Sequence, residues 1–185
     1  DAATVSSQAG AFAAGMQASK VIPTYKHFPG LGRVTANTDT SADVVDRTTS
    51  RLPDAAVSVF AGAIAAGAQV IMVSSATYAL IDASAPAVFS SKIVTDMLRT
   101  EMGFSGVVIT DDVSAAVQVQ GVAAGDRAVQ AIRAGCDIVL ASAEPAVAAD
   151  MVKALIAAAQ SDPAFAARVD ESAARVLALK GSLQS

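Results

Sequence analysis

The sequence has one cysteine, one histidine, no tryptophan and an aromatic content of only 4% over 185 residues. A single cysteine excludes a disulfide within the chain, and the apolar surroundings of Cys136 predict a buried, unreactive thiol. A single histidine, His27, without other ligand residues at a metal-binding spacing argues against a metal site. Because the sequence also has neither a GxGxxG motif nor a P-loop lysine, it indicates no nucleotide site.

Long hydrophobic runs and basic clusters are missing as well. No uninterrupted apolar run reaches the roughly 18 residues of a membrane span, so the hydrophobic content of 53% indicates a packed interior. The net charge is −4, and lysine and arginine do not gather in one region, which argues against nucleic acid as a partner. An uncharged substrate suits this composition better.

Apolar runs rich in β-branched residues alternate with helical patterns along the chain. The predicted strands are 21–25, 68–73, 106–110 and 137–140. Helices are predicted from Asp1, over 53–67, over 90–103, up to Gly135, over 142–161 and from Asp170 to Gly181. Such alternation, with strands apolar on both faces, predicts right-handed crossovers and a buried parallel sheet. Four strands cannot close an eight-stranded barrel, so residues 1–185 are predicted to be a single partial domain.

Ionisable residues follow two of the predicted strands directly. Lys26 and His27 come after the first strand, and Asp111 and Asp112 after the third. Since parallel strands present their carboxyl ends at one rim, Lys26, His27 and Asp111 are expected to converge there. Asp111 at such a position suits a nucleophile or general base, and capping of the next segment is the alternative. Lys26 and His27 suit sugar hydroxyls or phosphate, or else a structural histidine beside a solvated lysine.

The loop from His27 to about Ser50 is longer than a connector needs to be. Within it, Asn37-Thr38-Asp39 is the polar triplet with a carboxylate nearest to the strand end. The triplet is expected either to swing over the rim and bring Asp39 to it, or to form an Asx-turn in a solvated loop.

Two motifs together resemble glycoside hydrolase family 3, in its β-N-acetylglucosaminidase-like branch. They are Lys26-His27-Phe28-Pro29-Gly30-x-Gly32 and Gly103-Phe104-x-Gly106-Val107-Val108-x-Thr110-Asp111-Asp112. The resemblance implies an α/β fold in which this chain is the second half of a (β/α)8 TIM barrel, with four parallel strands alternating with helices. It also implies a retaining exo-acting β-glycoside hydrolase, of β-N-acetylhexosaminidase or β-glucosidase type, that needs no cofactor. Asp111 matches the nucleophile, and Lys26 and His27 match the pair that binds the sugar.

The sequence departs from the family pattern at the acid/base. The branch uses an Asp-x-His pair on the loop after the Lys-His strand, and Asn37 and Asp39 stand at those positions. Leu31 also replaces the usual histidine after Pro-Gly. Asp39 is therefore the candidate acid/base, and a carbohydrate-binding pseudoenzyme is the alternative function. The strand pattern alone also allows a doubly wound ligand-binding domain.

The resemblance places the first half of the barrel outside this chain. A first-half segment, from the same gene product or separate, or a second copy of the chain is therefore expected as a partner, beside the carbohydrate substrate. The alanine-rich helices resemble those of actinobacterial members of the family, so an exported or cell-envelope location is favoured over the cytoplasm.

Overall fold

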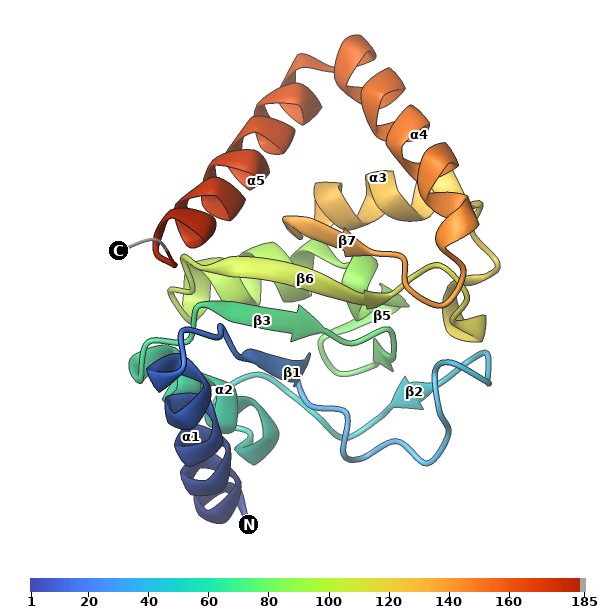
Figure 1. The fold of residues 1–185 in the computed structure, drawn as a ribbon. Coiled ribbons are helices and arrows are strands. Elements are labelled where there is room, and N and C mark those ends of the chain that lie inside the picture. Colours follow the sequence, from blue (N-terminus) through green and yellow to red (C-terminus); the bar gives the residue numbers. More distant parts are fainter. Residues whose placement is uncertain (184–185) are drawn as a thin grey trace.

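Four parallel strands form the main sheet of the computed structural model, which describes residues 1–183 (Figure 1). They are β1 (Thr24–Phe28), β3 (Val70–Val73), β6 (Val107–Asp112) and β7 (Ile138–Leu140). Their order in the sheet is β1-β3-β6-β7, and each neighbouring pair is parallel. The four predicted parallel strands are confirmed, and β1 and β7 form the two edges of this sheet.

Helices alternate with these strands. The longer helices are α1 (Ala2–Ala18), α2 (Ala55–Ala65), the π-helix η2 (Lys92–Glu101), α3 (Ala124–Ala134), α4 (Ala148–Ser161) and α5 (Pro163–Gly181). The short 3-10 turns are η1 (Ala87–Phe89), η3 (Val117–Val119) and η4 (Pro145–Val147). None of the helices within residues 1–183 combines the length and the apolar character needed to cross a membrane.

Three predicted boundaries are wrong. The helix predicted from residue 142 begins at Ala148, after the 3-10 turn η4. The first strand begins at Thr24, which pairs with Val70, rather than at Val21, because Pro23 has no N–H to donate to the ladder. Lys26 and His27 therefore lie inside β1. The last helix begins at Pro163, since the Asp162 carboxylate accepts hydrogen bonds from the first backbone N–H groups, and Asp170 lies within the helix.

A second, three-stranded sheet organises segments that the sequence pattern marks only as irregular. It consists of β2 (Val45–Asp46), β4 (Thr77–Tyr78) and β5 (Asp82–Pro86), in that order. β2 lies in the long loop after β1, and β4 and β5 lie in the loop after β3. The pairing of β2 with β4 thus joins two rim loops that are far apart in the sequence.

The two faces of the main sheet have different surroundings. Ile71, Val73 and Val108 are completely buried, whereas Met72 and Ile109 are half-buried. Successive side chains of a strand point to opposite faces, so one face packs beneath the helices and the other stays partly open. The prediction of strands buried on both faces is wrong for Met72 and Ile109, because no layer within residues 1–183 covers their face completely.

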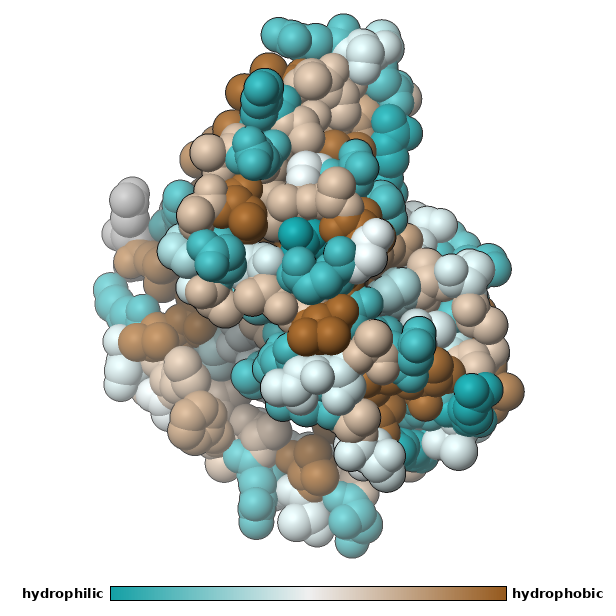
Figure 2. All heavy atoms as spheres, turned by 90° about the vertical axis from the view of Figure 1, so that its right-hand side faces the viewer, coloured by the Kyte–Doolittle hydropathy of each residue, from teal (hydrophilic) through white to brown (hydrophobic). Residues whose placement is uncertain are grey.

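The carboxyl ends of the strands point to the right in Figure 1 and toward the viewer in Figure 2. Polar residues in teal and small residues in pale colours lie there among isolated apolar residues in brown. The α4–α5 pair projects above the rest of this face. Lys26 and His27 on β1 and Asp111 and Asp112 on β6 lie near this rim.

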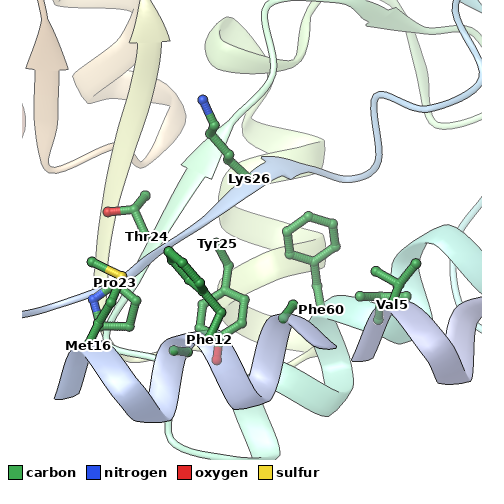
Figure 3. Close-up of a pocket in the computed structure, with 11 residues that line it drawn as sticks. Val5, Phe12, Met16, Pro23, Thr24, Tyr25, Lys26 and Phe60 are labelled. Atoms are coloured by element: carbon green, nitrogen blue, oxygen red, sulfur yellow. The ribbon is translucent and has the colours of Figure 1, made fainter. Parts of the chain in front are cut away.

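Apolar side chains remain open along both edges of the main sheet. At the β1 edge, an apolar cavity of about 420 Å³ lies against α1 and α2, and Figure 3 shows Phe12 and Met16 of α1 beside Pro23 and Tyr25. The Phe12 side chain is 73% exposed. At the β7 edge, a second apolar cavity of about 390 Å³ lies against α4 and α5. Both edges therefore expose surface of the kind that normally packs against another layer.

A buried charge cluster joins α5 to the sheet at the end opposite the rim. The Asp137 carboxylate, just before β7, is fully buried and accepts hydrogen bonds from the Val108 N–H and from Arg99, Arg168 and Arg175. Burial raises the pKa of Asp137, but the hydrogen bonds from Val108 and the arginines outweigh it and hold the pKa below its usual range. The cluster fixes α5 against η2 and β6.

Candidate functional site

A cavity of about 520 Å³ opens at the rim of the main sheet. Its lining includes Lys26 and His27 of β1, Asp111 of β6 and Asp39 of the long loop. Figure 3 shows Lys26 projecting from β1 on the side opposite to α1. The structure thus brings together all four residues that the sequence singles out, although they come from three separate segments.

His27 and Asp111 are neighbours across this cavity. His27 Nε2 lies 3.6 Å from Asp111 Oδ2, and their side chains are 22% and 17% exposed. This separation exceeds a hydrogen bond, so both polar ends remain able to bind a substrate. Burial lowers the pKa of His27, and attraction to Asp111 opposes that shift while repulsion from Lys26 adds to it. The lowered pKa favours the neutral imidazole, which has one donor and one acceptor nitrogen.

The two adjacent carboxylates at the end of β6 have different roles. Asp112 Oδ1 accepts from the N–H and hydroxyl of Ser114, and Oδ2 accepts from Ser142 and from the Ala143 N–H. Burial opposes ionisation, but these hydrogen bonds hold the pKa of Asp112 well below its usual range. Asp112 therefore performs the capping that the sequence left open for either residue. Within residues 1–183, Asp111 Oδ1 accepts the N–H of Asp112 alone, and the residue lines the cavity with its Oδ2 nearest to His27.

The Asn37–Asp39 triplet forms an Asx-turn and lies at the cavity. The Asn37 side-chain oxygen accepts the Asp39 N–H at 2.8 Å, which confirms the turn as one of the two expected conformations. Asp39 nevertheless lines the cavity with His27 and Asp111, so the turn and the rim position occur together.

Leu31 lines the cavity, and Gly30 forms the turn just before it. Leu31 lines it with an apolar side chain where the family pattern has histidine. Gly30 has φ +136°, and a Cβ there would come within 2.7 Å of Ala56 Cβ. A glycine is therefore required at this turn.

Within residues 1–183, no group of three or more His, Cys, Asp or Glu side chains is placed to hold a metal ion. Cys136 is completely buried in the core, and burial raises the pKa of its thiol to about 12, as expected for an unreactive cysteine.

The family of this chain follows from its match to a family model. The model for the glycosyl hydrolase family 3 N-terminal domain matches residues 1–179. The chain belongs to glycoside hydrolase family 3. The expectation from the paired Lys-His and Asp-Asp motifs is confirmed, and with it the fold class: an α/β chain of the TIM-barrel type, with four parallel strands alternating with helices.

Two solved structures superpose closely on this chain. A β-N-acetylhexosaminidase from Beutenbergia cavernae is 60% identical with a TM-score of 0.96, covering 98% of this chain and 53% of that chain. A glycoside hydrolase family 3 β-N-acetylglucosaminidase from Paenibacillus is 30% identical with a TM-score of 0.85, covering 94% and 34%. A protein named "Uncharacterized secreted glycosyl hydrolase" from Arthroderma benhamiae is 36% identical over 98% of this chain and 52% of its own length. The chain therefore spans about half the length of this relative.

Sequence reasoning missed the residues that support the rim loops. Gln118, in η3, contacts the long loop through both its backbone and its side chain. Ser142, after β7, contributes to the cap of Asp112. No motif or spacing marks Gln118, and the sequence pattern marks Ser142 only as the start of a predicted helix, because their partners are 74 and 30 positions away in the chain.

Proposed function

We propose that this protein is a retaining exo-acting β-glycoside hydrolase of the β-N-acetylhexosaminidase type. The observation that carries the proposal is the Asp111 carboxylate at the end of β6, 3.6 Å from His27 in a cavity shared with Lys26 and Asp39. The solved β-N-acetylhexosaminidase that is 60% identical supports the choice of an N-acetylated sugar.

The residues of the rim suit a double-displacement reaction. Asp111 attacks the anomeric carbon as the bond to the leaving-group oxygen breaks, and that oxygen takes a proton from Asp39. A glycosyl ester of Asp111 results. In the second step Asp39 accepts a proton from water, the water oxygen bonds to the anomeric carbon, and the Asp111 carboxylate is released. Lys26 and His27 hold the sugar through hydrogen bonds to its hydroxyl groups.

The nucleophile is tested by the hydrolysis of 4-nitrophenyl N-acetyl-β-glucosaminide, beside the β-glucoside, by the full-length protein and its Asp111→Asn variant. The amide keeps the size of the side chain but cannot form a stable glycosyl ester. We expect kcat to fall at least about a thousandfold without loss of the fold. Retained activity in Asp111→Asn would remove Asp111 from the role of nucleophile.

The acid/base is tested separately with Asp39→Ala. General acid catalysis is worth about 10² to 10⁴ in rate, so turnover is expected to slow by a factor in that range. Added azide should partly restore it by attacking the glycosyl ester without needing a base. An unchanged rate would dismiss Asp39.

A second candidate function is a carbohydrate-binding pseudoenzyme. It is favoured by the Asn37-x-Asp39 pair at the Asp-x-His positions of the family pattern, and by the engagement of the Asn37 side chain in a turn. Binding of N-acetylglucosamine, measured by calorimetry on the full-length protein, together with no hydrolysis of either aryl glycoside, would support it.

We infer that the natural product is longer and that a first-half segment completes the barrel. The apolar cavities at the β1 and β7 edges and the relatives of about twice this length support that segment as the occupant. Residues 1–185 alone are expected to associate or aggregate on size-exclusion chromatography. A stable, monodisperse monomer would contradict the inference.

Export to the cell envelope or the medium is also proposed. The relative from Arthroderma benhamiae whose name describes a secreted glycosyl hydrolase supports it. Fractionation of the producing cells tests the location, and recovery of the protein only from the cytoplasm would contradict it.

A further inference from the structure

The segment after the nucleophile strand holds the loop that carries Asp39. The Val117 N–H donates to the Asp39 carbonyl at 3.2 Å, and the Gln118 N–H donates to the Thr38 carbonyl at 3.1 Å. Thr38 is only 3% exposed. The backbone on which the Asp39 side chain is mounted is therefore hydrogen-bonded to η3, a few residues beyond Asp111.

The Gln118 side chain fixes the far end of the same loop. Its Oε1 accepts the Val44 N–H at 2.8 Å, and its Nε2 donates to the Val44 carbonyl at 3.4 Å. A side-chain amide here satisfies both backbone groups of one residue, as a neighbouring strand would. Val44 is itself buried and its carbonyl also accepts from the Thr77 N–H, so the amide ties the loop to η3 where it enters the small sheet.

Gln118 does not line the cavity, so its effect on chemistry must pass through the loop. A general acid works only while its proton is within hydrogen-bond reach of the leaving-group oxygen. A loop held at Thr38, Asp39 and Val44 spends more time in that position than a loop attached only at its ends.

We propose that Gln118 is a positioning residue that holds Asp39 ready for proton transfer. The inference rests on the proposed function, because it assigns a role to Asp39 in glycoside cleavage. It predicts that loss of the Gln118 amide slows the protonation of the leaving group more than the attack by Asp111.

The test compares two substrates that differ in their need for an acid. The first is 3,4-dinitrophenyl N-acetyl-β-glucosaminide, whose leaving group departs as a phenolate without being protonated. The second is phenyl N-acetyl-β-glucosaminide, whose leaving group needs a proton from an acid. For Gln118→Ala in the full-length protein, kcat/KM is expected to fall tenfold or more with the phenyl glycoside and less than threefold with the dinitrophenyl glycoside. Gln118→Glu keeps the acceptor for the Val44 N–H and should recover part of the loss.

Gln120→Ala is the matched control. The Gln120 side chain donates to the Ser114 carbonyl at 2.9 Å, so this variant loses a hydrogen bond of the same segment without touching the loop at 37–44. Its rates with both substrates should stay within about twofold of the wild type. Equal losses with both substrates in Gln118→Ala, or no loss with either, would overturn the proposal.

Amide hydrogen exchange separates this inference from the proposed function. Without the Gln118 side chain, the Val44 N–H loses its acceptor, so residues 37–44 should exchange faster while α3 stays unchanged. Faster exchange in a protein that cleaves neither glycoside would refute the proposed function and leave the contact between Gln118 and the loop established. Unchanged exchange in an active protein would refute the role of Gln118 alone.

Discussion

Asp137→Asn is the substitution that tests most directly how α5 is held against the main sheet. The side chain is fully buried, and Arg99 and Arg168, its closest ion-pair partners, are only 13% and 17% exposed. Asparagine has nearly the same size, so no cavity forms. The variant instead leaves a group of partly buried arginines without their common counter-charge, and it replaces one acceptor oxygen by a donor.

The expected loss can be estimated from this geometry. Removing one partner of a buried ion pair costs about 3 to 5 kcal/mol, and partial exposure of the arginines places the value near the lower end, at about 3 kcal/mol. For an m-value of about 2 kcal/mol per molar urea, the midpoint should fall by about 1.5 M. Urea unfolding of the full-length protein, followed by circular dichroism, measures both quantities.

Glu171→Gln is the matched control. Glu171 contacts Arg168 and Arg175 from the outer side of the cluster, at 3.5 and 3.8 Å, and is 60% exposed. Exposed pairs contribute about 0 to 1 kcal/mol, so this midpoint should move little. If Asp137→Asn costs no more than Glu171→Gln, the buried cluster does not stabilise the fold as argued.

The pH dependence of the same variant gives an independent check. The folded-state pKa of Asp137 is lowered, so its stabilisation is present above the unfolded pKa of about 4 and is lost as the pH falls through the folded value. The difference in stability between the wild type and Asp137→Asn should therefore be constant near neutral pH and shrink below about pH 4. A difference that grows on acidification would contradict this sign.

Two further predictions concern the rim and the core. In Asp112→Asn, an amide NH₂ would face backbone and hydroxyl donors, so kcat should fall at least about tenfold with little change in KM; a steady-state assay that shows an unchanged kcat would refute a positioning role. Cys136, with a pKa of about 12 in the core, should resist iodoacetamide at pH 8 in the folded protein and react fully in urea, as followed by intact mass. Rapid alkylation of the folded protein would contradict its burial.

The sequence alone determined the strand-helix alternation, the four parallel strands and the residues at the rim. These features are local, because a β-branched apolar run, a glycine after a helix and an ionisable residue after a strand act over a few positions. It misplaced the start of β1 by three residues and the cap of α5 by eight, where Pro23 and the Asp162-Pro163 pair set the boundaries. An apolar pattern that runs on across such a residue gives no sign of where an element starts. In both places the proline or the capping residue sets the start.

Tertiary structure decided how the rim is divided between chemistry and support. Asp111 and Asp112 are the same residue type at adjacent positions, so the sequence does not distinguish their roles. The hydrogen bonds from Ser114 and Ser142 make Asp112 the cap, and Asp111 lines the cavity. Likewise, the loop that carries Asp39 has the polar composition of a solvated loop. Its hydrogen bond to Gln118 is made at Val44, 74 positions away in the chain. Contacts at such separations depend on the path of the whole chain, so no local pattern reveals them.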